Sequence, residues 1–125
     1  GNTTSSHLTI EKNGAYGKLE NFDVEVINFA NICDKYDFAK IDAEGSEIKI
    51  LNSIKENSWN KFSCFVEITS FKKEKELENL FNKLSKINVR FFVQSLGWES
   101  AKRFNQLPNN WKDGNCYISK KPLAL

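Results

Sequence analysis

The run DFAKIDAEGSEIKILNSI, from Asp37 to Ile54, combines a strand pattern, a group of carboxylates and a helix pattern in one stretch. Its opening residues FAKI predict a short apolar strand whose single charge is Lys40. The acids Asp42, Glu44 and Glu47 come next, and apolar residues then return at helical spacing. In open α/β sheets, ligands bind where the carboxyl ends of strands lead into helices. This junction is therefore the first candidate for a functional site.

Strand and helix patterns alternate along the rest of the chain. We expect strands over residues 7–10, 22–29, 38–41, 62–69, 89–95 and 115–120, a helical turn over 30–36, a helix that begins near 48 and closes at 57–60, and a helix over 72–87. The last of these is the clearest, because its apolar residues recur at i, i+3, i+4, i+7 and i+10. The long segment 96–114 is expected to be a loop.

This order of elements predicts an α/β fold with a mostly parallel sheet and covering helices. The strand over 62–69 has apolar residues at alternate positions and also between them, which is typical of a sheet covered on both faces. The strand over 115–120 follows a loop and not a helix, so we expect it to run antiparallel to its neighbours.

Length and composition restrict the class of protein. A chain of 125 residues with 40% hydrophobic content forms at most one domain around one core. Its 18 basic and 16 acidic residues are mixed along the sequence, which gives no basic surface for nucleic acid. No apolar run approaches the roughly 20 residues of a membrane span, and the N-terminus does not resemble a signal sequence. We expect a cytoplasmic protein that binds neither nucleic acid nor membrane. Because the chain begins with Gly1 and not Met, we also expect a fragment.

The three cysteines, Cys33, Cys64 and Cys116, are far apart and form no Cys-x-x-Cys pair. Neither a disulfide framework nor a zinc site is indicated. They are expected to be reduced thiols in the core.

The run KIDAEGSEIKIL over residues 40–51 resembles the hallmark of FkbM-type methyltransferases, in which a strand ends in Lys-x-Asp-x-Glu-Gly-x-Glu and leads into a helix. Further segments are similar to that family: GNTTSSHL at 1–8, FDVEVINFANI at 22–32, FVEIT at 65–69, and the closing strand at 115–120. The resemblance covers most of the chain. It implies an S-adenosylmethionine-dependent O-methyltransferase with a seven-stranded, Rossmann-like fold.

In that family the cofactor lies on a Gly-rich turn after the first strand, and an acidic residue after the second strand holds its ribose hydroxyls. No Gly-x-Gly-x-Gly occurs in this sequence. The resemblance therefore implies that residues 1–125 are a single, partial domain, the C-terminal half of the methyltransferase fold without its N-terminal cofactor-binding strands. Such a chain is expected to be inactive alone, and no cofactor-binding residue is assigned.

Asp42, Glu44 and Glu67 are the candidate catalytic residues. If the two strands that carry them are adjacent and parallel, their carboxylates face one cleft, where one of them positions the acceptor hydroxyl or accepts its proton. A structural interpretation stays open, because acids stabilise a helix N-terminus by about 0.3–1 kcal/mol and Lys40 is an obvious ion-pair partner. It leaves Gly45 unexplained, since glycine there costs about 0.5–1 kcal/mol unless the backbone must come close to something.

Other candidate sites have less support. Asp42 and Glu67 together suit a hard cation, but no ligand pattern accompanies them, so we predict no metal. His7 is expected to be solvated. Trp98, Phe104 and Trp111 either shape an acceptor pocket or fix the long loop to the core.

The acceptor is a small molecule or glycan with a hydroxyl group, and the choice among sugar, polysaccharide and natural product stays open. The alternative function is a non-catalytic α/β module that binds a partner, or a second copy, through an exposed strand edge at 38–41.

Overall fold

The computed structural model describes residues 7–13, 19–25, 29–42, 45–68, 74–108 and 114–122, with side chains from residue 31 onward. The strands are β1 (His7–Asn13), β2 (Leu19–Glu25), β3 (Phe38–Asp42), β4 (Ser63–Glu67), β5 (Arg90–Val93), β6 (Glu99–Ser100) and β7 (Asn115–Ser119). The helices are α1 (Phe29–Lys35), α2 (Glu47–Ser53) and α3 (Glu74–Ser85), with 3₁₀ turns η3 (Glu56–Asn60), η5 (Gln94–Leu96) and η6 (Phe104–Gln106).

Most predicted elements are present, and their boundaries differ where strand pairing decides them. The strand predicted over 22–29 is β2, which begins at Leu19 because its backbone pairs with β1 as far as Asn13. Phe29 opens α1 and is not part of a strand. The predicted loop 96–114 contains β6, which pairs with β5, and the turn η6. The helix predicted to close at 57–60 ends at Ser53, and η3 is a separate turn.

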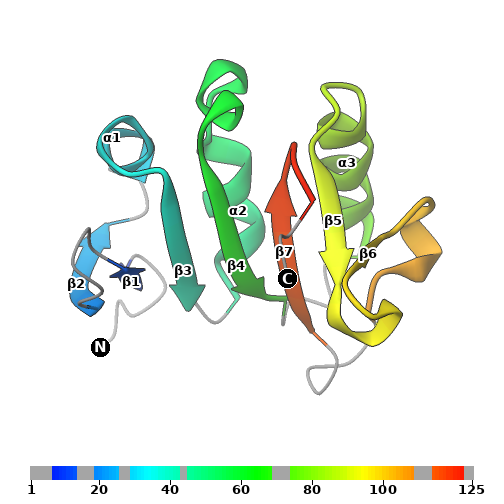
Figure 1. Ribbon diagram of the computed structural model, residues 1–125, viewed down its shortest axis with the longest axis horizontal. Coiled ribbons are helices and arrows are strands. Elements are labelled where there is room, and N and C mark those ends of the chain that lie inside the picture. Colours follow the sequence, from blue (N-terminus) through cyan, green and yellow to red (C-terminus); the bar gives the residue numbers. More distant parts are fainter. Residues whose placement is uncertain are drawn as a thin grey trace.

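The sheet has the order β2-β1-β3-β4-β7-β5-β6 in the described residues. The expectation of a mostly parallel sheet is wrong, since β3–β4 is the one parallel pair among these neighbours. The hairpin β1–β2 adds to β3 in antiparallel orientation, and β7 inserts antiparallel between β4 and β5. The antiparallel last strand is confirmed. Because β7 opposes both neighbours, β3, β4 and β5 still point the same way, as Figure 1 shows.

Helices α2 and α3 lie on one face of this sheet (Figure 1). The predicted apolar stripe of α3 is buried against it, and Lys83 Nζ donates to the Asn52 backbone oxygen at 3.3 Å, which connects α3 to α2. We call this side the covered face; its buried strand residues are Ala39, Ile41, Cys64, Val66, Phe91, Val93, Cys116 and Ile118. The intervening residues form the open face, which comprises Phe38, Lys40, Asp42, Ser63, Phe65, Glu67, Phe92, Asn115 and Tyr117.

The expectation that β4 is covered on both faces is wrong. Phe65 is half-buried and Glu67 is exposed, because neither α2 nor α3 packs on the open face. Strand β3, which the alternative function needs as an exposed edge, is hydrogen-bonded on both sides, to β1 and to β4. The fold therefore leaves a face of the sheet accessible at 38–41, and not an edge.

Candidate functional site

The carboxyl ends of three strands, β3, β4 and β5, lie at one edge of the sheet. The parallel register pairs Ile41 with Val66, so the next residues, Asp42 and Glu67, lie side by side at the ends of β3 and β4. Glu67 is also opposite Asn115 at the start of β7. Strand β5 ends at the same level, where Val93 is opposite Cys116. The parallel orientation of β3 and β4 therefore brings the two predicted acids together.

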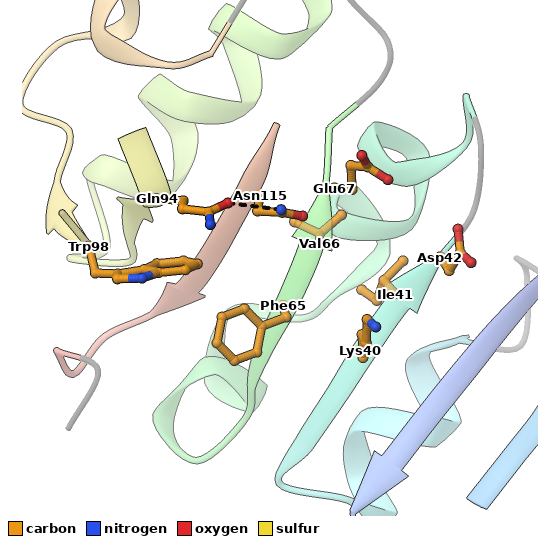
Figure 2. Close-up of a pocket in the computed structure, with 9 residues that line it drawn as sticks. All are labelled: Lys40, Ile41, Asp42, Phe65, Val66, Glu67, Gln94, Trp98 and Asn115. Atoms are coloured by element: carbon orange, nitrogen blue, oxygen red, sulfur yellow. Dashed lines mark hydrogen bonds between the residues drawn. The ribbon is translucent and has the colours of Figure 1, made fainter. Parts of the chain in front are cut away.

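A pocket of about 590 Å³ lies at this edge and extends along the open face. Figure 2 shows the residues that line it, which are Lys40, Ile41, Asp42, Phe65, Val66, Glu67, Gln94, Trp98 and Asn115. The carboxylates lie at one end, at the tips of β3 and β4, and the rings of Phe65 and Trp98 lie at the other. Its volume is in the range of about 300–1,000 Å³ that small-molecule sites occupy.

The predicted site residues have different positions in the structure. Asp42 and Glu67 are exposed and line this one pocket. Glu44 lies outside the described residues. Glu47, the third acid of the motif, is completely buried at the first residue of α2 and does not line the pocket. Lys40, which sequence reasoning assigned as an ion-pair partner for the acids, lines the pocket too.

Two neutral polar residues in the pocket, Gln94 and Asn115, were missed by sequence reasoning. Asn115 Nδ2 donates a hydrogen bond of 2.9 Å to Gln94 Oε1, and this pair bridges the end of β5 and the start of β7. Their side chains are exposed. The signal that could have found them is position, because Gln94 directly follows β5 and Asn115 begins β7, at the edge where the acids lie.

The aromatic residues of the long segment 96–114 divide between the two predicted roles. Trp98 lines the pocket, and its ring contacts that of Phe65 edge to face, with centroids 5.6 Å apart. Phe104 instead packs on Phe81 of α3, with centroids 6.3 Å apart, and fixes the segment to the core. Trp111 lies outside the described residues. Trp98 has a positive φ of 66°, which is an outlier for a bulky side chain.

The conformation of Gly45 explains why glycine follows the acids. Its φ is 80°, in the left-handed region that side chains disfavour. A Cβ built at this position would meet nothing within 4 Å among the described residues. The left-handed backbone of the turn from β3 into α2 is therefore a sufficient reason for the glycine.

The cysteines belong to the core and not to the site. All three are free and completely buried, which confirms the prediction of core thiols. Burial raises the pKa of Cys33 to about 12, with a smaller contribution from the charge of Asp34, and burial alone raises the pKa of Cys116 to about 12. The pKa of Cys64 is well above its usual 9.0 for the same reason. These thiols stay protonated and are not nucleophiles at neutral pH.

In the part of the chain that the structure describes, no three side chains of the metal-ligating types gather into a site. Within the same residues, no helix has the length and apolar character needed to cross a membrane.

Comparison with known proteins gives one finding. The family model of the methyltransferase FkbM domain matches residues 1–107. No curated protein and no solved structure matches the chain. The family match includes β3 and β4, whose last residues Asp42 and Glu67 form the carboxylate end of the pocket. The chain belongs to the FkbM methyltransferase family.

Proposed function

We propose that residues 1–125 form the acceptor-binding part of an S-adenosylmethionine-dependent O-methyltransferase with a Rossmann-like fold. The observation that carries the proposal is the meeting of Asp42 and Glu67 in one pocket at the carboxyl edge of parallel strands. The common direction of β3, β4 and β5 supports the fold, because it gives the sheet a single ligand-binding edge.

In this proposal the pocket residues prepare the acceptor. Methylation of an oxygen needs a hydroxyl group held in line with the methyl donor and a route for its proton. A carboxylate at Asp42 or Glu67 accepts the hydrogen bond of that hydroxyl, which fixes its direction and places a base on its proton. The aromatic end of the pocket holds the remainder of the acceptor and excludes water from that side.

We propose that the described residues do not hold S-adenosylmethionine. The described glycines with positive φ, Gly45 and Gly97, are single residues in separate turns. Gly97 is followed directly by the indole of Trp98, which lines the pocket. We therefore propose that the residues which hold the cofactor lie outside these 125 and that the chain alone is inactive.

Methyl transfer in the longest natural polypeptide that contains these residues tests the acceptor site. We expect Asp42→Asn or Glu67→Gln to lower kcat by about a hundredfold or more, as loss of a general base does. The control is Glu99→Gln, since Glu99 is an exposed acid of β6 outside the pocket. Full activity in both pocket variants would refute the assigned roles.

Calorimetric titration of residues 1–125 with S-adenosylmethionine tests the cofactor assignment. We expect no saturable heat. Saturable binding at micromolar cofactor would show that these residues contain the cofactor site.

The alternative of a non-catalytic module gains no support, because the strand on which it depends is hydrogen-bonded on both sides.

A further inference from the structure

Phe65 and Trp98 form an aromatic wall of the pocket, and contacts with other rings hold this wall in place. The ring of Phe65 contacts Trp98 at 5.6 Å, Phe38 at 5.7 Å and Tyr117 at 5.1 Å between centroids. Both Phe65 and Trp98 are half-buried, so part of each ring is accessible from the pocket. Rings that are braced on several sides lose little conformational freedom when a ligand packs on them. Because the two rings stand at 84° to each other, a ligand with a flat apolar face can stack on one ring while its edge contacts the other.

Trp98 lies in this wall despite an unfavourable backbone conformation. Its φ of 66° follows a φ of 66° at Gly97, and its N–H donates to the Val93 oxygen at 2.9 Å. A left-handed conformation costs a non-glycine residue about 1–2 kcal/mol. Asparagine or glycine would adopt it with less strain. Strain of this kind is concentrated at ligand-binding positions, where the side chain and not the backbone is needed.

The other residues of the pocket offer hydrogen-bonding groups of both types. The Gln94–Asn115 pair uses one amide hydrogen and one amide oxygen on each other. This bond does not use Gln94 Nε2 or Asn115 Oδ1, so the pair presents a donor and an acceptor. Asp42 and Glu67 add carboxylate acceptors. A ligand that fits must both donate and accept several hydrogen bonds around its perimeter.

The charge of the lining discriminates among hydroxyl compounds. Two carboxylates and one ammonium group, that of Lys40, line the pocket, so its formal charge is negative. A phosphorylated or nucleotide-linked acceptor would be repelled at this end. A lipid or polyketide chain would cover the amides and carboxylates without replacing their hydrogen bonds with water. A neutral sugar ring meets both conditions, because its C–H face packs on an aromatic ring and its hydroxyls both donate and accept.

Resting on the proposed function, we propose that the acceptor is a neutral pyranose unit of a saccharide, packed on Trp98 and Phe65. Its hydroxyls bond to the Gln94–Asn115 pair and to the carboxylates, and one of them receives the methyl group. The polar lining residues are exposed, so the pocket is open to solvent and admits a sugar that is part of a longer chain.

Binding of sugars to residues 1–125 without any methyl donor tests this inference. The probes are methyl glucoside, glucose 1-phosphate, catechol and a linear alcohol, each followed by ligand-observed saturation-transfer NMR. We expect methyl glucoside to bind with the strongest transfer to the hydrogens on one ring face, and glucose 1-phosphate to bind more weakly. Preference for catechol, the linear alcohol or the phosphate would overturn the proposal.

Variants of Trp98, with a control outside the pocket, sharpen the test. We expect Trp98→Asn, which tolerates the left-handed backbone, to weaken glucoside binding about tenfold, the loss of roughly 1.4 kcal/mol. Trp98→Phe should retain a measurable part of the binding because it keeps a ring, and the control Glu99→Gln should not change it. Circular dichroism verifies that each variant is folded. Unchanged affinity in a folded Trp98→Asn variant would overturn the proposal.

The proposed function and the saccharide assignment can be refuted independently of each other. If another class of hydroxyl compound binds in a Trp98-dependent manner, the saccharide assignment is wrong and the acceptor site stands. If the glucoside binds here and the longest polypeptide still transfers methyl groups after Asp42→Asn and Glu67→Gln, the catalytic roles are wrong and the sugar site stands.

Discussion

On the covered face of the sheet, the strand residues are almost completely inaccessible, whereas their direct neighbours on the open face are half or fully exposed, except Phe92, which is buried. In β4, Cys64 and Val66 are 0% and 3% exposed, while Phe65 is half-buried and Glu67 exposed. Since successive side chains of a strand point to opposite faces, each strand contributes both to the core and to the pocket. The comparison shows that the exposed side chains of the pocket come from positions between the core residues, although Ile41 and Val66 of the core also line it.

The largest expected effect comes from truncating the same residue type on the two faces. Phe91, 0% exposed on the covered face, contacts Phe81 at 5.6 Å between centroids. We expect Phe91→Ala to lower the free energy of unfolding by about 3–5 kcal/mol, because the packed side chains around Phe91 cannot fill the cavity that the lost ring leaves. Phe65→Ala on the open face should cost about half as much or less, since its ring is already partly in water. Urea denaturation followed by circular dichroism measures both. Equal losses would remove the energetic distinction between the faces.

A second test uses the cysteines, all of which belong to the core. Between pH 9 and about 12 an unfolded thiol loses its proton, while buried Cys33 and Cys116 keep theirs. The unfolded state then binds fewer protons, so the free energy of unfolding falls as pH rises, by at most about 1.4 kcal/mol per pH unit for each thiol. Below about pH 8 the thiols contribute almost no slope, because the unfolded thiols are then also protonated.

Urea denaturation at pH 8, 9 and 10 measures this slope. Cys64 contributes in the same direction, since its pKa is also raised. Replacing Cys116 by alanine should reduce the slope, because one buried thiol is gone, while Glu99→Gln should leave it unchanged. A stability that is flat from pH 8 to pH 10 would contradict the protonated state of the core thiols.

Much of the covered face could be predicted from the sequence, because it depends on local periodicity. The spacing of apolar residues in α3 identified its buried stripe, and the alternation in β4 identified Cys64 and Val66. The same pattern misassigned Phe65 to a second covered face. An apolar residue between two core positions of a strand can face either a second core or a ligand pocket. The period of the sequence does not distinguish these two cases.

Sheet topology and half of the pocket depend on long-range contacts, which periodicity does not report. The parallel pair β3–β4 could be predicted from the helix between its strands, and with it the meeting of Asp42 and Glu67. The insertion of β7 between β4 and β5 could not, so neither could the approach of Asn115 to Gln94. Motif reasoning found the acids because charge near an apolar strand is conspicuous. Neutral amides at strand ends carry no such signal.

The turn at Gly45 connects β3, which contributes to the pocket, to α2 on the covered face. Substitutions in this turn have a smaller expected effect. We expect Gly45→Ala to cost about 1–2 kcal/mol through its left-handed φ of 80°. Gly45→Asn should cost less despite its larger side chain, because asparagine tolerates this conformation and a Cβ meets nothing within 4 Å. Thermal unfolding of both variants measures the difference. A greater loss for asparagine than for alanine would mean that space and not conformation selects glycine.

The smallest expected effect concerns a hydrogen bond on the open face. Tyr117 Oη donates to Ser63 Oγ at 3.1 Å, while its ring contacts Phe65 and Phe92 with centroids 5.1 Å and 6.0 Å apart. Tyr117→Phe keeps both ring contacts and leaves the half-buried Ser63 hydroxyl able to bond to water. We therefore expect a loss of about 0.5–1.5 kcal/mol in the free energy of unfolding. Ser63→Ala should cost a similar amount, and the double variant little more, because both remove the same bond. Additive losses in urea denaturation would show that this hydrogen bond does not stabilise the open face.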